Sequence, residues 1–570
     1  MEPLGLKASY YGHAATGLLH VRPVLDLHDR TDLKKLRQVA DQTSALVKQF
    51  KGSLSAEHGV GIARTEYMRE QLGDEMLGVM REIKKTFDPK NIFNPGKILS
   101  DGRHKIDDHL RDSFERPMEL PFGPVLAFAF KDRSFVGNLE QCNGCGGCRK
   151  DAPTMCPTFL ATGDEIMSTR GRANIIRAAL QLRVNGHDPL RSAELDAALS
   201  NCLSCKGCTP ECPSNVNLAL LKAELMYARH RRDGLPLRER ILSNVDLLGR
   251  LGCIMPSFAN STLRFGPLRL LMEKILGLSA KRSLPHYAKQ RFDTWFARRK
   301  VGTSRCDVRT PQRGVPAKGK VILWDDTFVR YHEPHIGIAA VKVLEALGFE
   351  VSLAKNRRCC GRPAFSQGNL DAAAKLGKHN VALLNCNTGV SPVGATHDGA
   401  GTLSYDVPII FLEPSCYSMF VEDYRELKIE NAEIVARRCF LFEKFVDEIL
   451  DDEPSALHFN SKSQNIAIHA HCHAKSLMNL EFMVNLAERL PGRKAKLLDT
   501  GCCGMAGAFG ALAEKYELSL KVAEPLVQKV NHQSPGSEIV ASGTSCRHQI
   551  VDLTTANPKH MAEVIAEAIV

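Results

Sequence analysis

The sequence predicts a multidomain protein of mixed α and α/β class, for three reasons. Its 570 residues exceed what a single hydrophobic core usually accommodates. Its 19 cysteines fall largely into short, spaced blocks, including two within a segment expected to be helical. From about residue 318, short apolar segments alternate with helical ones, a pattern typical of parallel α/β units.

The composition excludes several classes of protein. With 44% hydrophobic and 24% charged residues, the chain is globular rather than disordered or collagen-like. Its longest apolar run, near 125–130, is far shorter than the roughly 18 residues that a membrane-spanning helix needs. The first residues lack a basic segment followed by an apolar one, so we expect no secretory signal.

Residues 1–100 are predicted to form a compact first domain. A strand is expected over 20–27 and a helix over 32–52. A second helix is expected over about 65–87, where an Asp-Pro pair ends it. Residues 101–135 are expected to be a linker.

A small polar set in the first domain is a candidate metal site. His13 and His20 flank a glycine-containing loop, and Glu57 lies among small residues. Two imidazoles and a carboxylate suit a divalent cation such as zinc or manganese with an open coordination position. Such a metal polarises a substrate oxygen, and the neighbouring His58 is a candidate base. The alternative is a group of structural histidines.

The central cysteines carry the most specific motif. The run that begins at Cys202 has the spacing C-x2-C-x2-C-x3-C-P, which matches bacterial ferredoxins residue for residue. A second copy begins at Cys142, although its fourth cysteine follows after seven residues. We therefore predict a ferredoxin-type domain with two [4Fe–4S] clusters over 136–228. The alternatives are a zinc ribbon and buried structural thiols, but zinc favours CxxC pairs over triplets.

The eight cysteines are divided between two predicted clusters. In two-cluster ferredoxins the fourth cysteine of each block binds the other cluster. Set one therefore consists of Cys142, Cys145, Cys148 and Cys212. Set two consists of Cys202, Cys205, Cys208 and Cys156.

Residues 229–315 are predicted to be a basic helical connector. The chain has 75 Lys and Arg against 64 Asp and Glu, a net charge of +11, and 229–300 alone holds 16 basic and five acidic residues. Cations such as Arg264, Arg269 and Lys274 alternate with apolar residues, which indicates amphipathic helices with cations reaching solvent. The segment is either a solvated connector or a surface that docks an anionic membrane or an acidic partner. No nucleic-acid-binding motif accompanies it, so we expect no nucleic-acid partner.

The C-terminal region contains two similar halves, 316–455 and 460–570. Expected strands lie at 321–324, 351–353, 409–412, 466–468, 496–498 and 538–540.

Their cysteine motifs repeat. The pair Cys359 and Cys360, followed by glycine, recurs as Cys502 and Cys503, and Cys416 corresponds to Cys546. Cys472 corresponds to about residue 329, where half one has no cysteine. Half two thus offers four thiolates, enough for a further iron–sulfur site, whereas half one offers three. Structural cysteines remain the alternative for both.

The other cysteines and histidines of this region are less informative. Disulfides between adjacent cysteines are strained, which favours reduced thiolates and a cytoplasmic location. Cysteines outside the motifs are expected to be buried thiols: Cys253, Cys306, Cys386 and Cys439. Three alternating histidines suggest zinc or, more simply, polar contacts: His469, His471 and His473.

Three stretches of the first domain, 11–20, 55–61 and 88–97, resemble the C-terminal part of FAD-linked oxidases of the vanillyl-alcohol oxidase type. In that family the first two stretches supply the metal ligands and base of D-2-hydroxyacid dehydrogenases, and the third closes near the flavin. The resemblance implies roles for the following residues: His13, His20 and Glu57 as metal ligands, His58 as the base and Asn94 as a flavin contact. Leu18 stands where relatives often have asparagine, so one polar contact is lost.

Residues 136–570 resemble the iron–sulfur, cysteine-rich (CCG) subunit of glycolate oxidases. The order of the parts resembles that of long fused flavin/iron–sulfur oxidoreductases, some of which oxidise D-2-hydroxyglutarate. The resemblance implies a C-terminal piece of an FAD-linked oxidase, a dicluster domain and a duplicated CCG domain. It also implies electron transfer from a D-2-hydroxyacid of the D-2-hydroxyglutarate, D-lactate or glycolate class, through FAD and iron–sulfur clusters, to a quinone-like acceptor.

The FAD-binding domain of this family lies N-terminal to the part matched here. We therefore expect it in a longer reading frame or in a separate polypeptide, with the protein cytoplasmic or peripheral on the inner face of a membrane through 229–300. One alternative is a non-catalytic iron–sulfur electron-transfer subunit. Another is a heterodisulfide-reductase-like CCG module, against which the missing half-one cysteine argues.

Overall fold

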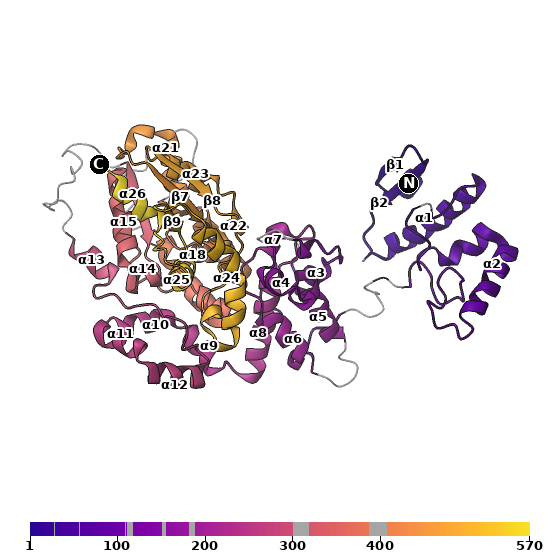
Figure 1. The fold of residues 1–570 in the computed structure, drawn as a ribbon, viewed down its shortest axis with the longest axis horizontal. Coiled ribbons are helices and arrows are strands. Elements are labelled where there is room, and N and C mark those ends of the chain that lie inside the picture. Colours follow the sequence, from indigo (N-terminus) through magenta and orange to yellow (C-terminus); the bar gives the residue numbers. More distant parts are fainter. Residues whose placement is uncertain are drawn as a thin grey trace. The chain divides into compact units, whose positions relative to one another are not determined.

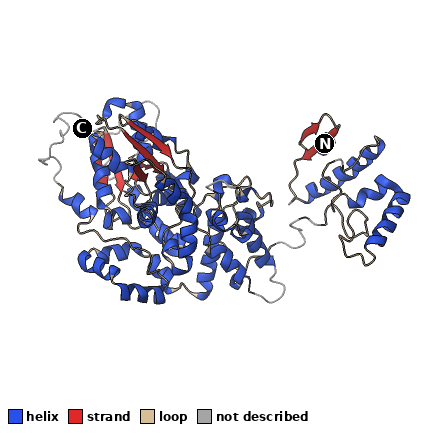
Figure 2. Cartoon of the chain, in the orientation of Figure 1, coloured by secondary structure: helices blue, strands red, loops and turns tan. Residues whose placement is uncertain are grey.

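The computed structural model describes all residues except 28, 56, 109, 111–117, 131, 151–154, 182–187, 300–317 and 387–406. The chain divides into two compact units, Met1–Glu119 and Leu120–Val570 (Figure 1). Both units combine helices with strands, so the mixed class predicted from the sequence is confirmed (Figure 2). Within the described ranges, no helix has both the length and the apolar content needed to cross a membrane.

The first unit consists of a hairpin and two long helices. Strands β1 (Ala8–His13) and β2 (Leu18–Pro23) pair antiparallel. The second strand ends earlier than predicted, because Pro23 has no N–H with which to continue the ladder. Helices α1 (Arg30–Gln49) and α2 (Met68–Phe87) follow. Helix α1 begins where the Asp29 carboxylate accepts hydrogen bonds from the first free N–H groups.

Short helices surround the cysteine blocks in the second unit. They are α3 (Phe135–Glu140), α4 (Pro157–Thr162), α5 (Thr169–Gln181), α6 (Ala193–Ser200), α7 (Cys208–Glu211) and α8 (Leu218–Asp233). Helix α8 is buried along most of its length. Its Glu224 carboxylate accepts hydrogen bonds from the N–H groups of Val125 and Leu126, which attaches the preceding segment to this domain.

The described residues of the basic segment, up to 299, contain the helices α9 (Leu237–Leu242), α10 (Val245–Gly252), α11 (Pro256–Arg264), α12 (Gly266–Leu276) and α13 (Phe292–Arg298). Proline and glycine at their ends separate several of them, as expected. Helix α10 packs closely on half one, since a Cβ at Gly249 would clash with the Tyr331 ring. The prediction that Arg269 reaches solvent is wrong. Its guanidinium is buried and donates to the carbonyls of Ser279 and Arg282.

The described residues of the C-terminal region, which leave out 387–406, form two parallel sheets. The first has the order β4-β3-β5-β6 and the second β8-β7-β9. The strands are β3 (Gly319–Trp324), β4 (Phe349–Leu353), β5 (Ile409–Phe411), β6 (Cys439–Leu441), β7 (Gln464–His469), β8 (Arg493–Leu497) and β9 (Glu538–Ala541). Strand β6 was not predicted; it has only three residues, too few to show a period.

Helices connect these strands and cover the sheets (Figure 1). In half one they are α14 (Thr327–Tyr331), α15 (Pro334–Ala346), α16 (Arg362–Ser366), α17 (Leu370–Cys386), α18 (Pro414–Ser418), α19 (Tyr424–Glu426), α20 (Ala432–Ala436) and α21 (Phe442–Asp452). In half two they are α22 (Cys472–Leu477), α23 (Glu481–Glu488), α24 (Tyr516–Asn531), α25 (Thr544–Leu553) and α26 (Met561–Ala568).

The two halves have equivalent turns after their central strands. Helix α14 follows β3 as α22 follows β7, with Asp326 and His471 as the respective N-caps. The first residue of α22 is Cys472, and the first residue of α14 is Thr327. The half-one position that lacks a cysteine is therefore Thr327 rather than a residue near 329.

Candidate functional site

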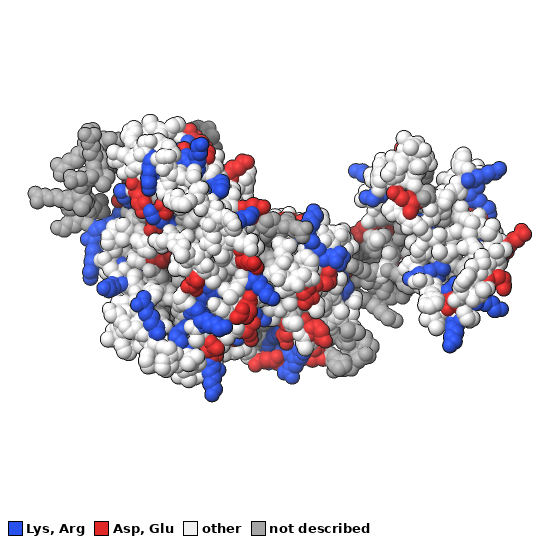
Figure 3. Space-filling view, viewed as in Figure 1, with Lys and Arg blue, Asp and Glu red and all other residues white. Residues whose placement is uncertain are grey.

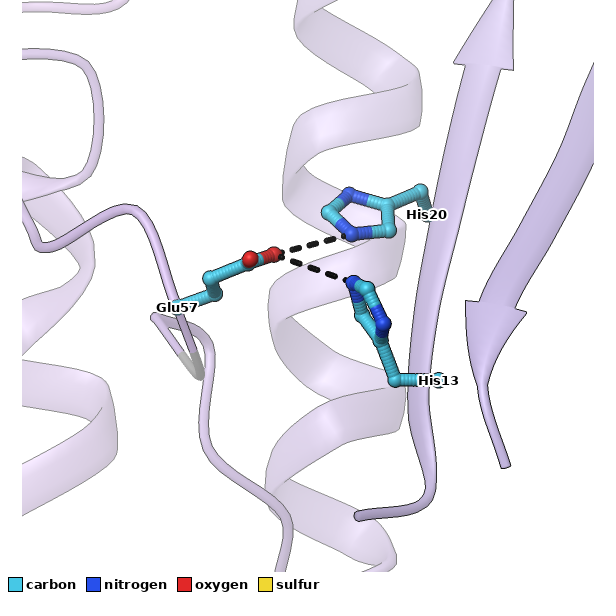
Figure 4. A group of neighbouring side chains, drawn as sticks. All are labelled: His13, His20 and Glu57. Atoms are coloured by element: carbon cyan, nitrogen blue, oxygen red, sulfur yellow. Dashed lines mark ion pairs between the residues drawn. The ribbon is translucent and has the colours of Figure 1, made fainter. Parts of the chain in front are cut away.

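The structure brings His13, His20 and Glu57 together in the first unit (Figure 4). A Glu57 carboxylate oxygen lies 3.0 Å from His20 Nε2 and 3.6 Å from His13 Nε2. The three candidate ligand atoms lie within 4.8 Å of one another. The His20 side chain is 15% exposed and that of Glu57 48%, so the group is open to an incoming molecule. Two imidazoles and one carboxylate around an open position fit a divalent cation.

The hairpin explains why the two histidines converge. Strand register pairs Tyr11 with His20, and His13 is two residues further along β1 on the same face. The two rings are therefore diagonal neighbours, with centroids 5.6 Å apart. Tyr11 stacks on His20 at 4.4 Å and fixes its ring. Glu57 reaches them from the loop between α1 and α2.

His58 lies beside this group. Its Nε2 is 3.4 Å from the Glu57 carboxylate, and its exposed ring packs edge-on against His20. Asn94, the predicted flavin contact, lies in a turn with positive φ, where its side chain accepts a hydrogen bond from Lys97.

Set two lines a single cavity. Cys156, Cys202, Cys205 and Cys208 all contribute to its wall, together with Arg172. Cys156 comes from the other cysteine block, as the predicted exchange of fourth ligands requires. The buried Arg172 guanidinium donates a hydrogen bond to Cys156 Sγ at 3.1 Å. A buried cation at the wall of a cavity lined by four thiols suits an anionic iron–sulfur cluster.

Set one lies next to set two. Cys212, from the second block, packs beside Cys148 and Cys156, so the fourth ligand again reaches across. The loop that carries Cys145 curls tightly, because Gly144 and Gly146 both adopt positive φ. Backbone N–H groups point at the thiols: that of Gly147 is 3.5 Å from Cys145 Sγ and that of Arg170 is 3.3 Å from Cys148 Sγ. Such donors stabilise thiolate ligands.

The half-two cysteines form a buried group. Hydrogen bonds with Cys502 and Cys546 hold the pKa of Cys503 well below its usual range, and the His469 ring adds to the effect. A hydrogen bond with Cys502, aided by nearby His471, lowers the pKa of Cys472 to about 7 despite burial. Hydrogen bonds with the neighbouring cysteines raise the pKa of Cys502 and of Cys546 well above its usual range. The environment therefore favours the thiolate, the form that binds metals, at two of the four cysteines.

The half-one cysteines have a different environment. Cys359, Cys360 and Cys416 are buried, and Cys416 Sγ lies 3.1 Å from Cys360 Sγ. A hydrogen bond with Cys360 lowers the pKa of Cys416, but burial and the nearby Asp326 outweigh this effect and raise that pKa to about 11. Thr327 occupies the position of the fourth cysteine.

Set two lies against half two. Cys205 and Cys472 pack in one apolar group with Cys502. His473 follows Cys472, and its ring nitrogen Nε2 is 3.2 Å from the carbonyl oxygen of Ser204. Cys205 of set two thus lies close to the half-two cysteines.

A buried ion network joins set two to half one. Lys206, between two set-two cysteines, binds Ser418 and Asp423, with its ammonium 2.8 Å from an Asp423 oxygen. Arg362 follows Gly361 of half one and binds the same Asp423. The backbone N–H of Arg362 points at Cys360 Sγ.

Several residues of this region play other roles. Cys439 is buried and donates to the Val435 carbonyl, and Cys253 is half-buried. Cys306 and the Cys386 side chain lie outside the described residues. The His469 ring hydrogen-bonds Thr500. The residues that sequence reasoning missed are Arg172 and Lys206; each is distant in sequence from the groups it contacts, and one sequence gives no signal for such pairs.

Known proteins match the chain in three parts. Residues 1–98 match the model "FAD linked oxidases, C-terminal domain", residues 138–216 the "4Fe-4S dicluster domain", and residues 327–397 the "Cysteine-rich domain". The resemblance drawn from the motifs is therefore confirmed at the level of these domains.

Full-length relatives agree with the domains. The chain is 26% identical to a D-2-hydroxyglutarate dehydrogenase of Escherichia coli (strain K12), over 100% of this chain and 56% of that protein. It is 27% identical to an anaerobic glycerol-3-phosphate dehydrogenase subunit of the same strain, over 63% of this chain and 83% of that one. It is 24% identical to the glycolate oxidase iron-sulfur subunit of that strain, over 76% of this chain and 94% of that subunit. The chain is homologous to these proteins and spans about half the length of the D-2-hydroxyglutarate dehydrogenase.

Proposed function

We propose that the chain is the metal-binding and iron–sulfur portion of an FAD-dependent D-2-hydroxyacid dehydrogenase. The observation that carries the proposal is the convergence of His13, His20 and Glu57 in a chain that also gathers the set-two cysteines around one cavity. The homology to a D-2-hydroxyglutarate dehydrogenase and to subunits of other dehydrogenases and oxidases supports it.

Each side chain of the first unit has a distinct task in this proposal. When bound, a zinc or manganese ion supplies a Lewis acid, FAD a hydride acceptor and the iron–sulfur clusters one-electron carriers. His13, His20 and Glu57 hold the cation, which leaves an open side for the hydroxyl and carboxylate oxygens of the substrate. His58, exposed beside Glu57, removes the hydroxyl proton.

The flavin domain is supplied by another segment or polypeptide in this proposal. Large apolar side chains of the segment that carries the two histidines are exposed, among them Tyr10, Leu19 and Val24. An apolar surface of this kind is typical of an interface. Asn94 would lie at the flavin. The share of the relatives' length that the chain spans agrees with a further domain.

The proximity of Cys205 to Cys472 indicates where electrons leave set two in this proposal. Half two is in this proposal the next iron–sulfur site, and the final acceptor is a quinone-like molecule. In the alternative, the chain is only an electron-transfer subunit. These cysteines then have the same role, but His13, His20 and Glu57 bind no substrate.

One experiment separates these two functions. The purified chain is assayed for iron, sulfide and flavin, and for D-2-hydroxyglutarate-dependent dye reduction with and without an added flavin domain. Turnover that appears on adding the flavin domain supports the dehydrogenase. If the chain contains iron and sulfide but shows no turnover with or without the flavin domain, its function is that of an electron-transfer subunit.

Half two is expected to hold more iron than half one. Cys546→Ala removes one of the four thiols of half two and should lower the iron content by about four atoms per chain if the site is a cubane. The matched change Cys416→Ala, in a half with Thr327 at the fourth position, should lower it less. Iron analysis of both variants, after reconstitution, checks this. An equal loss of iron from both would contradict the distinction.

We also propose that helices α10–α12 contact the surface of an anionic membrane. Their exposed apolar side chains are Leu247, Leu248, Leu251, Ile254, Met255, Phe258, Phe265, Leu270, Leu271 and Ile275. Phe258 is 65% exposed and Ile254 72%. The exposed cations Arg250, Arg264 and Lys274 accompany them. Figure 3 shows this lower-left face of the larger unit as mostly uncharged, with scattered Lys and Arg.

The combined change of Ile254, Phe258 and Leu271 to serine tests this surface. It should weaken binding to vesicles containing anionic phospholipid at least about tenfold, because each side chain loses apolar contact. Ile434→Ser with Val551→Ser, which removes exposed apolar groups elsewhere, is the control and should leave binding unchanged. Sedimentation with vesicles measures the binding of both variants. If the triple variant binds as tightly as the unchanged protein, the membrane surface is wrong and the segment is a solvated connector.

A further inference from the structure

Two cations are buried at set two. The Arg172 side chain is 2% exposed, and its guanidinium donates to Cys156 Sγ, to the Ala198 carbonyl at 2.8 Å and to Thr158 Oγ1 at 2.8 Å. The Lys222 ammonium is also buried and donates to the carbonyl of Cys202. Both cations therefore contact residues of set two itself.

These cations have no acidic partner in the part of the chain that the structure describes. No ion pair of Arg172 or Lys222 with an Asp or Glu occurs there, in contrast to Lys206, whose charge is balanced by Glu422 and Asp423. A guanidinium does not lose its proton in proteins. Two buried and uncompensated positive charges are costly unless an anion lies beside them. At this position the anion is the thiolate-bound cluster.

Set one has a weaker positive environment. Its nearby cations are Arg149 and Arg170, and both pair with Glu165, at 3.2 Å and 2.8 Å. Both side chains are partly exposed, as is Glu165, and Cys145 is exposed as well. Water and Glu165 therefore screen the positive charge that set one receives.

This asymmetry has a redox consequence. A [4Fe–4S] cluster on four thiolates is an anion in both of its usual states, and reduction adds one negative charge. Nearby fixed positive charge stabilises the reduced state, and it does so most strongly where water is excluded. Burial alone would disfavour the added charge, but at set two the same burial holds two cations in contact with the ligands.

We propose that Arg172, assisted by Lys222, gives a cluster at set two a higher reduction potential than a cluster at set one. The first electron that enters the pair is then held at set two, the set that contacts Cys472 of half two. This inference rests on the proposed function, because it requires that both sets hold clusters.

A redox titration of the full chain, followed by electron paramagnetic resonance, tests the proposal. With dithionite as the reductant, the set-two signal should appear before the set-one signal; the Cys205→Ala variant, which removes a ligand from within the set-two block, identifies which signal is which. In Arg172→Gln the set-two midpoint should shift to lower potential. The difference between the two midpoint potentials should then become smaller, or the order of reduction should reverse. Arg172→Lys, which keeps the charge, should retain the original order. Arg149→Gln, at set one, should leave the set-two midpoint in place.

The outcomes separate the proposed function from the role of the cations. A chain that binds no iron or sulfide would refute the proposed function. Two outcomes would overturn only the role of the cations. In the first, both sets hold clusters but set one is reduced first; in the second, the set-two midpoint is unchanged when the charge is removed. If Arg172→Gln fails to take up iron at set two, Lys222→Met decides, since it removes the second cation without touching a thiol contact. An unshifted set-two midpoint in that variant would overturn the proposal.

Discussion

Replacing Cys156 with alanine is expected to remove one iron–sulfur cluster and leave the other intact. Seven residues separate Cys156 from Cys148 in its own block, yet Cys156 lines the cavity formed by Cys202, Cys205 and Cys208. Its sulfur also accepts the Arg172 hydrogen bond. The variant should therefore lose about four iron atoms per chain and the set-two resonance, while the set-one resonance persists.

Two further variants make this result specific. Cys212→Ala should produce the reciprocal loss, because Cys212 packs beside Cys148 of set one. Cys439→Ala removes a buried thiol that contacts the Val435 carbonyl and should leave the iron content unchanged. Iron analysis and low-temperature resonance spectra measure all three. If Cys156→Ala instead abolished the set-one signal, each block would bind its own cluster and the exchange of fourth ligands would be wrong.

The two cysteine sets show which features a single sequence can predict. Ligands that lie two or three residues apart on one loop are close in space whatever the rest of the fold, so spacing alone indicated them. The alternation of apolar strands with helices likewise predicted parallel sheets, because it reflects local periodicity. Strand β6 was missed because three residues carry too little pattern, and half one depends on it at the sheet edge.

Contacts between distant segments were not predictable in the same way. Arg172 contacts Cys156 across 16 residues, and Lys206 contacts Asp423 across 217. Neither pair has a spacing rule, because the fold rather than the local chain brings them together. The same reason explains Arg269, whose position in an amphipathic pattern suggested solvent but whose guanidinium caps two buried carbonyls.

The candidate metal group lies between these extremes. Residue types alone made His13, His20 and Glu57 a weak candidate, and the family resemblance strengthened it. The hairpin register then explains the convergence of the two histidines in physical terms. The role of each member stays a proposal, and substitutions distinguish ligands from the base.

His58→Ala is expected to abolish most turnover without removing the metal or the clusters. In the chain combined with its flavin domain, loss of a general base should lower kcat about 10²- to 10⁴-fold, which corresponds to roughly 3–5 kcal/mol of transition-state stabilisation.

Glu57→Gln removes the anionic member of the group, whose carboxylate lies 3.0 Å from His20, and should lower metal content as well as turnover. Turnover with D-2-hydroxyglutarate, metal analysis and the cluster spectrum are measured together. His532→Ala, an exposed histidine at the end of α24, is the control and should change none of these. Turnover that survives His58→Ala would assign the proton transfer to another group. Loss of metal in the same variant would make His58 a ligand instead of a base, because a base that only faces the substrate hydroxyl does not hold the cation.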